Sequence, residues 1–303
     1  MPPTSGLSTT GETSISVCIC ARNRPDELRR ALTSVSQSNL APEQIVVSDD
    51  SDDDRVASVV ADSALRITYA RGPRSGLGAN RNHAISLATG GHLLFLDDDA
   101  ALGRDFLTEV DDCLGRLPAR RRARTIVAGV EVKSGQTITP NKQGLLGFQS
   151  RPYRHGEPLQ TVVINAALFP RELFDSVEFD PQLMYGYDEV DLTTQAVALG
   201  FEIVPCFRAA NYHWPSPVGR AEYQPFTEAS RLYVTLKRRR CTEGSWLRAW
   251  PGFGLAIIHL YLASMKSSGF NGCGEARRTV AQGWAYYTDF AISARIARGG
   301  RPA

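Results

Sequence analysis

Three consecutive carboxylates, Asp97, Asp98 and Asp99, follow directly on the apolar run of the segment HLLFLDDDA, residues 92–100. Adjacent negative charges repel one another, and an apolar strand offers them no compensation, so water or a cation must neutralise them. Two interpretations follow from the residues alone. The aspartates form a solvated turn after a strand, or they form a metal or phosphate site at the carboxyl end of that strand.

Acidic residues on one turn can hold a divalent cation, and such a cation can bridge the two phosphates of a diphosphate. Mg²⁺ and Mn²⁺ favour oxygen ligands and readily accept phosphate oxygens in their coordination shell. The aspartate triplet therefore suits a metal site that a substrate completes.

A second acidic cluster lies in GYDEVDL, residues 186–192, and contains Asp188, Glu189 and Asp191. The pattern that follows predicts a helix with Gly200 as its stop, which puts the cluster in the first helical turn. Acidic residues stabilise that end of a helix through its dipole. Helix capping and proton transfer are thus both open to this cluster.

Apolar runs of strand length alternate with helix-like stretches from residue 15 onward, at residues 15–21, 44–50, 65–71 and 92–100. This alternation predicts an α/β fold with a parallel sheet covered by helices. Ligands of such sheets gather at the carboxyl ends of the strands. Three of the runs end in polar segments, CARNR, SDDSDDD and DDDA, which are therefore predicted to meet in one crevice.

Composition and short motifs exclude several other classes of protein. Thirty-four basic and 32 acidic residues give a formal charge of +2, so no general electrostatic footprint for nucleic acid is present. The chain has no Walker pattern and no G-x-G-x-x-G after the first predicted strand. The six cysteines form no C-x-x-C pair, which favours reduced core thiols and predicts a cytoplasmic protein.

Three segments differ in composition from the alternating strands and helices. Residues 1–13 are small and polar and predict a disordered leader. Residues 133–160 are rich in Gly, Gln, Pro and Arg, which predicts a long loop or flap over a site. From about residue 228 the pattern is helical; its apolar segment 250–265 and the basic run 237–240 are consistent with a packed helical appendage or with peripheral contact to a membrane.

Four segments in this order, SISVCICARNRPDELRRALTSV, QIVVSDDSDDD, GLGANRNHAISLATGGHLLFLDDDA and FDPQLMYGYDEVDLTTQAVALGFEIVP, resemble family 2 glycosyltransferases. The resemblance covers roughly residues 14–215. It implies a GT-A fold, in which a Rossmann-like, mostly parallel sheet is flanked by helices, over residues 14–227. The nucleotide half would be 14–104 and the acceptor half 105–227, followed by a helical extension at 228–303.

The resemblance also implies which residues bind a nucleotide. The loop after the first strand, Ala21, Arg22 and Asn23, would contact it. Asp50, with Asp49 as the close alternative, would accept a hydrogen bond from the base, as a carboxylate can from the ring N–H of a pyrimidine. Arg81 would contact the base or phosphates, or form a salt bridge that organises the aspartates. Asp97 and Asp98 would face the ribose or metal-bound water.

For the reaction itself, the resemblance implies an inverting transfer from a nucleotide diphosphate sugar, with UDP or dTDP sugars favoured, assisted by Mn²⁺ or Mg²⁺. Asp99 would bind the metal, with Asp97 and His213 as the further ligands; His213 could equally be a core residue or stack against an acceptor. Glu189 aligns with the catalytic base of the family and Asp188 is its rival. Asp191 and Trp214 would serve the acceptor, with helix support as the alternative for Asp191 and core packing for Trp214.

The processive synthases of this superfamily carry Q-x-x-R-W and membrane helices, and neither is found in this sequence. Transfer of one or a few sugars, hexosyl or related, to a glycan, a lipid-linked sugar or a small natural product is therefore expected. An aspartate-based phosphotransferase usually carries its aspartates directly after the first strand, as D-x-D-x-[TV]. The aspartate triplet of this chain follows a later strand, which makes that class less consistent with the sequence. The other alternative is a degenerate nucleotide-sugar-binding or scaffold protein whose altered DE pair no longer acts as a base.

Overall fold

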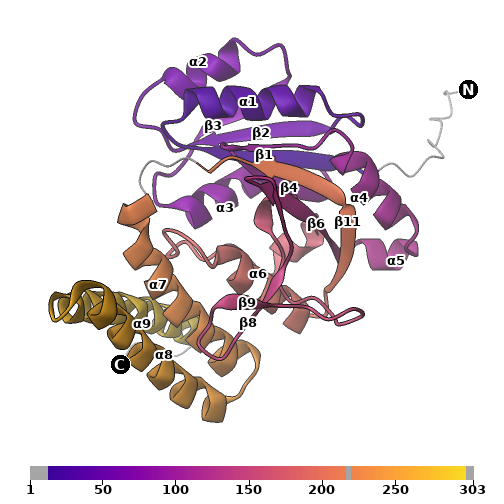
Figure 1. The fold of residues 1–303 in the computed structure, drawn as a ribbon. Coiled ribbons are helices and arrows are strands. Elements are labelled where there is room, and N and C mark those ends of the chain that lie inside the picture. Colours follow the sequence, from indigo (N-terminus) through magenta and orange to yellow (C-terminus); the bar gives the residue numbers. More distant parts are fainter. Residues whose placement is uncertain (1–12, 216–219, 298–303) are drawn as a thin grey trace, which may run out of the picture.

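The computed structural model describes residues 13–215 and 220–297. The predicted leader, residues 1–13, therefore lies outside the described residues except for Thr13. The described chain is a mixed α/β structure with helices on both faces of a nine-stranded sheet, followed by C-terminal helices (Figure 1). The fold class predicted from the sequence is confirmed.

The predicted strands form the first half of the sheet as parallel neighbours. They are β1 (Ile15–Ala21), β2 (Gln44–Asp49), β3 (Ile67–Arg71) and β4 (His92–Asp97), in the spatial order β3-β2-β1-β4. Helices α1 (Pro25–Ser36), α2 (Arg55–Ala61) and α3 (Leu77–Leu87) connect them. Because these strands are parallel, their carboxyl ends lie at one edge, as the polar strand ends predict.

The second half of the sheet mixes strand directions. Strand β10 (Ala167–Pro170) pairs antiparallel with both β4 and β6 (Thr125–Lys133). Strand β11 (Glu202–His213) runs parallel to β6 and pairs with the short β5 (Ala100–Ala101), while β7 (Gln136–Ile138) pairs with β6. Between these strands lie the helices α4 (Phe106–Gly115), α5 (Ala119–Arg122) and α6 (Asp188–Ala198), and the 3-10 turns η1 (Ile164–Ala166) and η2 (Arg171–Asp175).

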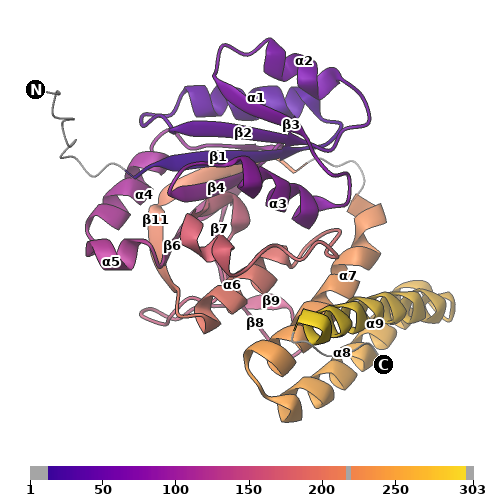
Figure 2. The same ribbon diagram turned by 180° about the vertical axis from the view of Figure 1, so that it is seen from behind.

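Strand β1 is buried along its whole length, and its alternate residues feed two separate cores. Ile15, Val17 and Ile19 pack with α1, α2 and α4 on one face. Cys18 and Cys20 pack with residues of α3 and α6 on the other. Figure 2 shows the same two layers from behind. The sheet is therefore held from both sides, which fixes the edge where its polar ends emerge.

Residues 133–160 are more ordered than the predicted loop. They contain β7 and a two-stranded hairpin of β8 (Asn141–Gln143) and β9 (Gln149–Pro152). Gln143 donates a hydrogen bond to the Thr235 hydroxyl at 3.2 Å, so the hairpin packs on the C-terminal helices. The composition of this segment concealed strands because they are short and mostly polar.

The C-terminal helical region is confirmed as α7 (Arg220–Lys237), the π-helical turn η3 (Arg238–Thr242), α8 (Trp246–Ser268) and α9 (Asn271–Ala297). The predicted boundary at residue 227 falls inside α7. Among the helices of the described residues, none is long and apolar enough to cross a membrane.

A buried ion-pair cluster fastens α7 to the sheet domain. The Lys237 ammonium lies 2.9 Å from the carboxylate of Asp180 and 2.8 Å from that of Asp191, and Tyr233 also donates to Asp180. All three charged groups are buried. Burial raises the pKa of Asp191 and the nearby Asp180 charge adds to this effect, whereas Lys237 lowers it, so the charge of Asp191 depends on the lysine.

We expect Lys237→Met to lower the free energy of unfolding by about 3–5 kcal/mol, because two buried carboxylates would lose their shared cation. Urea unfolding followed by circular dichroism measures the change. Lys266→Met removes an exposed lysine and is the control, expected within about 0.5 kcal/mol of wild type. Equal stability of the two variants would contradict a structural role for the cluster.

Candidate active site

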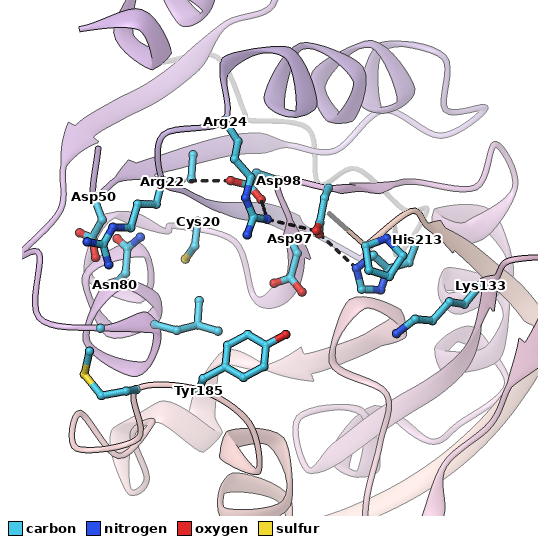
Figure 3. A pocket seen from close by; sticks show the side chains of 16 residues that line it. Cys20, Arg22, Arg24, Asp50, Asn80, Asp97, Asp98, Lys133, Tyr185 and His213 are labelled. Atoms are coloured by element: carbon cyan, nitrogen blue, oxygen red, sulfur yellow. Dashed lines mark hydrogen bonds and ion pairs between the residues drawn. The ribbon is translucent and has the colours of Figure 1, made fainter. Parts of the chain in front are cut away.

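A cavity of about 180 Å³ opens at the carboxyl edge of the sheet (Figure 3). The ends of β1, β2 and β4 contribute to it together, as the polar strand ends predict. Its lining comprises Cys20, Ala21, Arg22, Arg24, Asp50, Gly76, Leu77, Asn80, Asp97, Asp98, Asp99, Lys133, Met184, Tyr185, His213 and Pro215. The two interpretations of the aspartate triplet can now be separated, because its members have different partners.

Asp97 is held by two side chains, those of Arg81 and Asn165. One of its carboxylate oxygens accepts from Arg81 at 3.0 Å and the other accepts from Asn165 at 3.0 Å. Asn165 also accepts from the Asp97 backbone N–H at 2.8 Å. The side chain nevertheless keeps 27% of its surface exposed, toward the cavity. Asp97 is thus fixed in place and still accessible to a ligand.

Asp98 is the most enclosed member of the triplet. Its carboxylate accepts from the backbone N–H of Arg22 at 3.2 Å and from Arg24 at 2.9 Å. Burial raises its pKa to about 7, against the opposing effect of the Arg24 charge. These contacts tie the loop after β1 to the end of β4.

His213 lies at the opposite end of the cavity from Asp50 (Figure 3), and Asp99 contacts it there. The Nε2 atom of His213 lies 3.1 Å from Asp99, and its Nδ1 atom lies 3.0 Å from Glu131. Burial alone would lower the pKa of His213, but the interactions of its ring N–H groups with the Asp99 and Glu131 carboxylates outweigh burial and raise that pKa to about 9. The Arg24 guanidinium lies 3.0 Å from the other oxygen of Asp99.

Ligand atoms of Asp97, Asp99 and His213 all lie within 4.8 Å of one another, so these residues could hold a metal ion. Two carboxylates and an imidazole are a donor set that suits Mn²⁺ well. Glu131 on the second ring nitrogen would orient the imidazole, as carboxylates commonly do behind a ligating histidine. The predicted metal ligands are therefore brought together.

The acidic cluster of α6 is split between distinct surroundings. Asp188 is buried and forms an ion pair with Arg81, which is itself 2% exposed. Glu189 is partly buried, less so than Asp188, and its carboxylate accepts a hydrogen bond from the Gln149 side chain at 2.8 Å. This partial burial raises the pKa of Glu189. The Arg81 charge lowers the pKa of Glu189, whereas the Asp97 charge raises it. Asp191, bound by Lys237, points instead toward α7, an arrangement that favours helix support.

The two aspartates at the end of β2 also differ. Asp49 is fully buried and accepts from Tyr69 at 2.8 Å and from Arg71 at 2.9 Å. Asp50 lines the cavity and accepts from the Arg74 backbone N–H at 3.0 Å. Burial raises the pKa of Asp50. Of this pair, Asp50 is therefore the one that lines the cavity.

Gly72 makes room for Asp50 and Asn80. A Cβ atom at position 72 would overlap the carboxylate of Asp50 and the side-chain oxygen of Asn80. The absence of a side chain at this position lets the end of β3 approach α3 closely.

Of the three residues in the loop after β1 that were predicted to contact a nucleotide, two line the cavity and one does not. Ala21 and Arg22 line the cavity. Asn23 has a φ of 56°, and its side chain bonds the backbone and carboxylate of Asp52 instead. Its backbone N–H donates to Ser51 at 2.8 Å. Asn23 therefore shapes the loop between β1 and β2 and does not line the cavity.

Trp214 is 57% exposed and lies beside the cavity residues His213 and Pro215. Its ring is stacked on that of Tyr212, with centroids 6.1 Å apart and planes 15° apart. Tyr212 is also exposed. This pair is a surface platform, so the core-packing alternative for Trp214 is not supported.

Several residues of this site were missed from the sequence, among them Arg24, Asn80, Glu131, Lys133, Asn165 and Tyr185. Glu131 and Lys133 lie at the end of the apolar strand TIVAGVEVK, where a charged residue among apolar neighbours signals a buried partner. Arg24 was less distinctive in the sequence, because it is one of three charged or polar residues after β1. Asn80, Asn165 and Tyr185 could be identified only once the segments that approach the cavity were known.

Comparisons with known proteins agree with this architecture. The sequence model of glycosyl transferase family 2 matches residues 16–160. No curated protein sequence matches the chain. Among solved structures, the mannosyltransferase PcManGT from Pyrobaculum calidifontis, in complex with GDP-Man and Mn²⁺, is similar with a TM-score of 0.59 and 17% identity over 98% of this chain and 84% of that chain. S. aureus TarS 1-349 has a TM-score of 0.52 and 15% identity, over 89% and 92%.

We expect Mn²⁺ affinity to rise with pH between pH 6 and 8, by up to about tenfold per unit, because the metal must displace the His213 proton below its raised pKa. Isothermal titration at several pH values measures this dependence. His213→Ala should weaken binding and flatten the pH dependence, whereas His155→Ala, at an exposed position, should change neither. Affinity that is independent of pH in the wild type would rule out His213 as a ligand.

Proposed function

We propose that this chain, whose residues 16–160 match the sequence model of glycosyl transferase family 2, moves a sugar from a UDP or dTDP sugar to a hydroxyl group with inversion at the anomeric carbon. The transfer would add one or a few sugars and use a bound Mn²⁺ or Mg²⁺ ion. The observation that carries this proposal is the cavity itself, which presents Asp50 near one end and Asp97, Asp99 and His213 beyond it.

The nucleotide base is assigned to the Asp50 end of the cavity. A carboxylate can accept the ring N–H of uracil or thymine, and one Asp50 oxygen is already oriented by Arg74. Guanine also presents a ring N–H, so a GDP sugar is the rival donor that an experiment must separate. Asp49 is a poor candidate, because Tyr69 and Arg71 already occupy its carboxylate.

The diphosphate is assigned to the centre of the cavity. A metal ion held by Asp97, Asp99 and His213 would neutralise the charge that develops on the leaving diphosphate. The first turn of α3, at Gly76 and Leu77, lines the same space, and the N-terminus of a helix attracts phosphates. Two cations of the lining, Arg22 and Lys133, would add to this attraction.

We assign the general base to Glu189 rather than Asp188. In an inverting transfer, one carboxylate removes the acceptor hydroxyl proton as the oxygen attacks the anomeric carbon. Asp188 is committed to an ion pair with the Arg81 guanidinium. The pKa of Glu189 is raised by burial, and a carboxylate with a higher pKa is the stronger base once it is ionised.

The acceptor is assigned to the side of Trp214 and Tyr212. Stacked, exposed aromatic rings suit the apolar face of a sugar ring. A glycan, a lipid-linked sugar or a small natural product each fits this chemistry. Asp191 would act at a distance, by holding α6 through Lys237.

Nucleotide screening by thermal shift should identify the donor. UDP or dTDP with Mn²⁺ at saturating concentration is expected to raise the melting temperature by about 2 °C or more, because a ligand stabilises the state it binds. Asp50→Asn should reduce the shift, and Asp53→Asn, at an exposed position of the neighbouring loop, should leave it unchanged. A larger shift with GDP than with UDP or dTDP would overturn the donor assignment.

Glu189→Gln is expected to lower turnover by about 10²-fold or more while the donor-induced thermal shift remains. Release of nucleoside diphosphate from the donor found by the screen measures turnover. Asp188→Asn should instead lower the melting temperature, because buried Arg81 loses one of its two partners.

Two results would count against these roles. Full turnover by Glu189→Gln would remove it as the base. Donor binding without turnover by the wild-type chain, with Mn²⁺ and a panel of acceptors, would favour the degenerate binding or scaffold protein.

A further inference from the structure

Helix α8 has an apolar face that packs on the protein. Ala249, Phe253, Ala256 and Leu260 are buried against residues of α7 and α9. They recur every three or four residues, which places them on one side of the helix. This inner face accounts for the attachment of α8 to the domain.

A second apolar face of α8 points to solvent. Leu247, Leu255, Ile258 and Leu262 are 73, 47, 56 and 63% exposed. Their spacing also places them on one side, opposite the buried set. A helix of a water-soluble domain ordinarily carries polar residues on its outer face, so two opposed apolar faces require an explanation.

Two exposed aromatic residues lie at the two ends of α8. Trp246 at the start of α8 is 60% exposed, and Phe270 in the turn before α9 is 87% exposed. Helix α8 runs along the lower edge of the molecule in both ribbon views, away from the sheet (Figure 1; Figure 2). Tryptophan and phenylalanine are favoured at the boundary between water and lipid.

The charged residues of α8 and of the turn that follows it have one sign. Residues 244–274 contain no Asp or Glu, and their charged residues are Arg248 and Lys266. Both are exposed, and they lie about five turns apart on the helix, which puts them on the same side, next to Leu255. Such a basic border attracts an anionic surface, whereas it would repel a second copy of itself.

We propose that the outer face of α8 docks on the surface of a membrane that contains anionic phospholipid. The helix lies in the plane of the interface, with Leu255, Ile258 and Leu262 among the acyl chains and with Arg248 and Lys266 at the headgroups. The apolar face and the one-signed border, which are independent observations, both fit this occupant. Docking is separate from sugar transfer and stands or falls independently of the donor.

Co-sedimentation with vesicles tests the proposal, using phosphatidylcholine alone and phosphatidylcholine with one quarter phosphatidylglycerol. The wild-type chain is expected to bind the anionic vesicles at least about tenfold more tightly than the neutral ones, and 0.5 M NaCl should reduce that preference. The double variant Ile258→Asp, Leu262→Asp should lose about tenfold or more in vesicle affinity. The double variant Arg248→Gln, Lys266→Gln should lose the anionic preference.

The control is Phe207→Asp, which places the same charge at a position on β11 that is 55% exposed, close to the 56% of Ile258. It should bind vesicles like wild type. Circular dichroism of every variant establishes that the fold persists. The proposal is overturned if the wild-type chain ignores anionic vesicles, or if Phe207→Asp loses as much affinity as the α8 variant. It is also overturned if sedimentation velocity shows that the outer face joins two copies and is unavailable to lipid.

Discussion

The arrangement of the site depends on one buried cation, the guanidinium of Arg81. It is 2% exposed and sits between Asp97 at the end of β4 and Asp188 at the start of α6. A buried arginine cannot shed its proton, so it requires carboxylate partners, and these carboxylates in turn require it. The Phe179 ring, 5.3 Å from the guanidinium carbon, closes another side. The end of β4 and the start of α6, which we propose to serve the nucleotide and the acceptor, are therefore joined by one buried charge.

The same constraint explains how three adjacent aspartates coexist. Asp97 forms an ion pair with Arg81. Asp98 accepts hydrogen bonds from the Arg24 side chain and the Arg22 backbone. Asp99 contacts Arg24 and His213. The compensating groups come from α3, from the loop after β1 and from β11, so the repulsion along the chain is distributed over the fold. The residues with remaining exposure or exchangeable partners are the ones that could take a metal ion.

Much of this was accessible from the sequence, and the remainder was not for identifiable reasons. Apolar runs ending in polar residues predicted the parallel strands and their shared edge, because strand periodicity and burial are local properties. Glu131 and Lys133 were missed because they become neighbours of His213 only through the pairing of β6 with β11. The choice between Asp49 and Asp50 likewise depended on Arg71, which reaches Asp49 from β3. The local sequence pattern identifies candidate carboxylates. Tertiary contacts then decide which of them are bound by other side chains and which face the cavity.

The C-terminal helices take part in positioning the proposed base. Glu189 lies between two pinned residues of α6, since Asp188 is bound by Arg81 and Asp191 by Lys237 of α7. A helix held at both points cannot turn about its axis without breaking a buried ion pair, so the Glu189 side chain has a fixed direction. Helix α8 packs against α7 through Phe253 and Leu260. A surface bound by α8 would therefore have a defined orientation relative to Glu189, because the links between them are packed side chains and buried charges rather than a flexible linker.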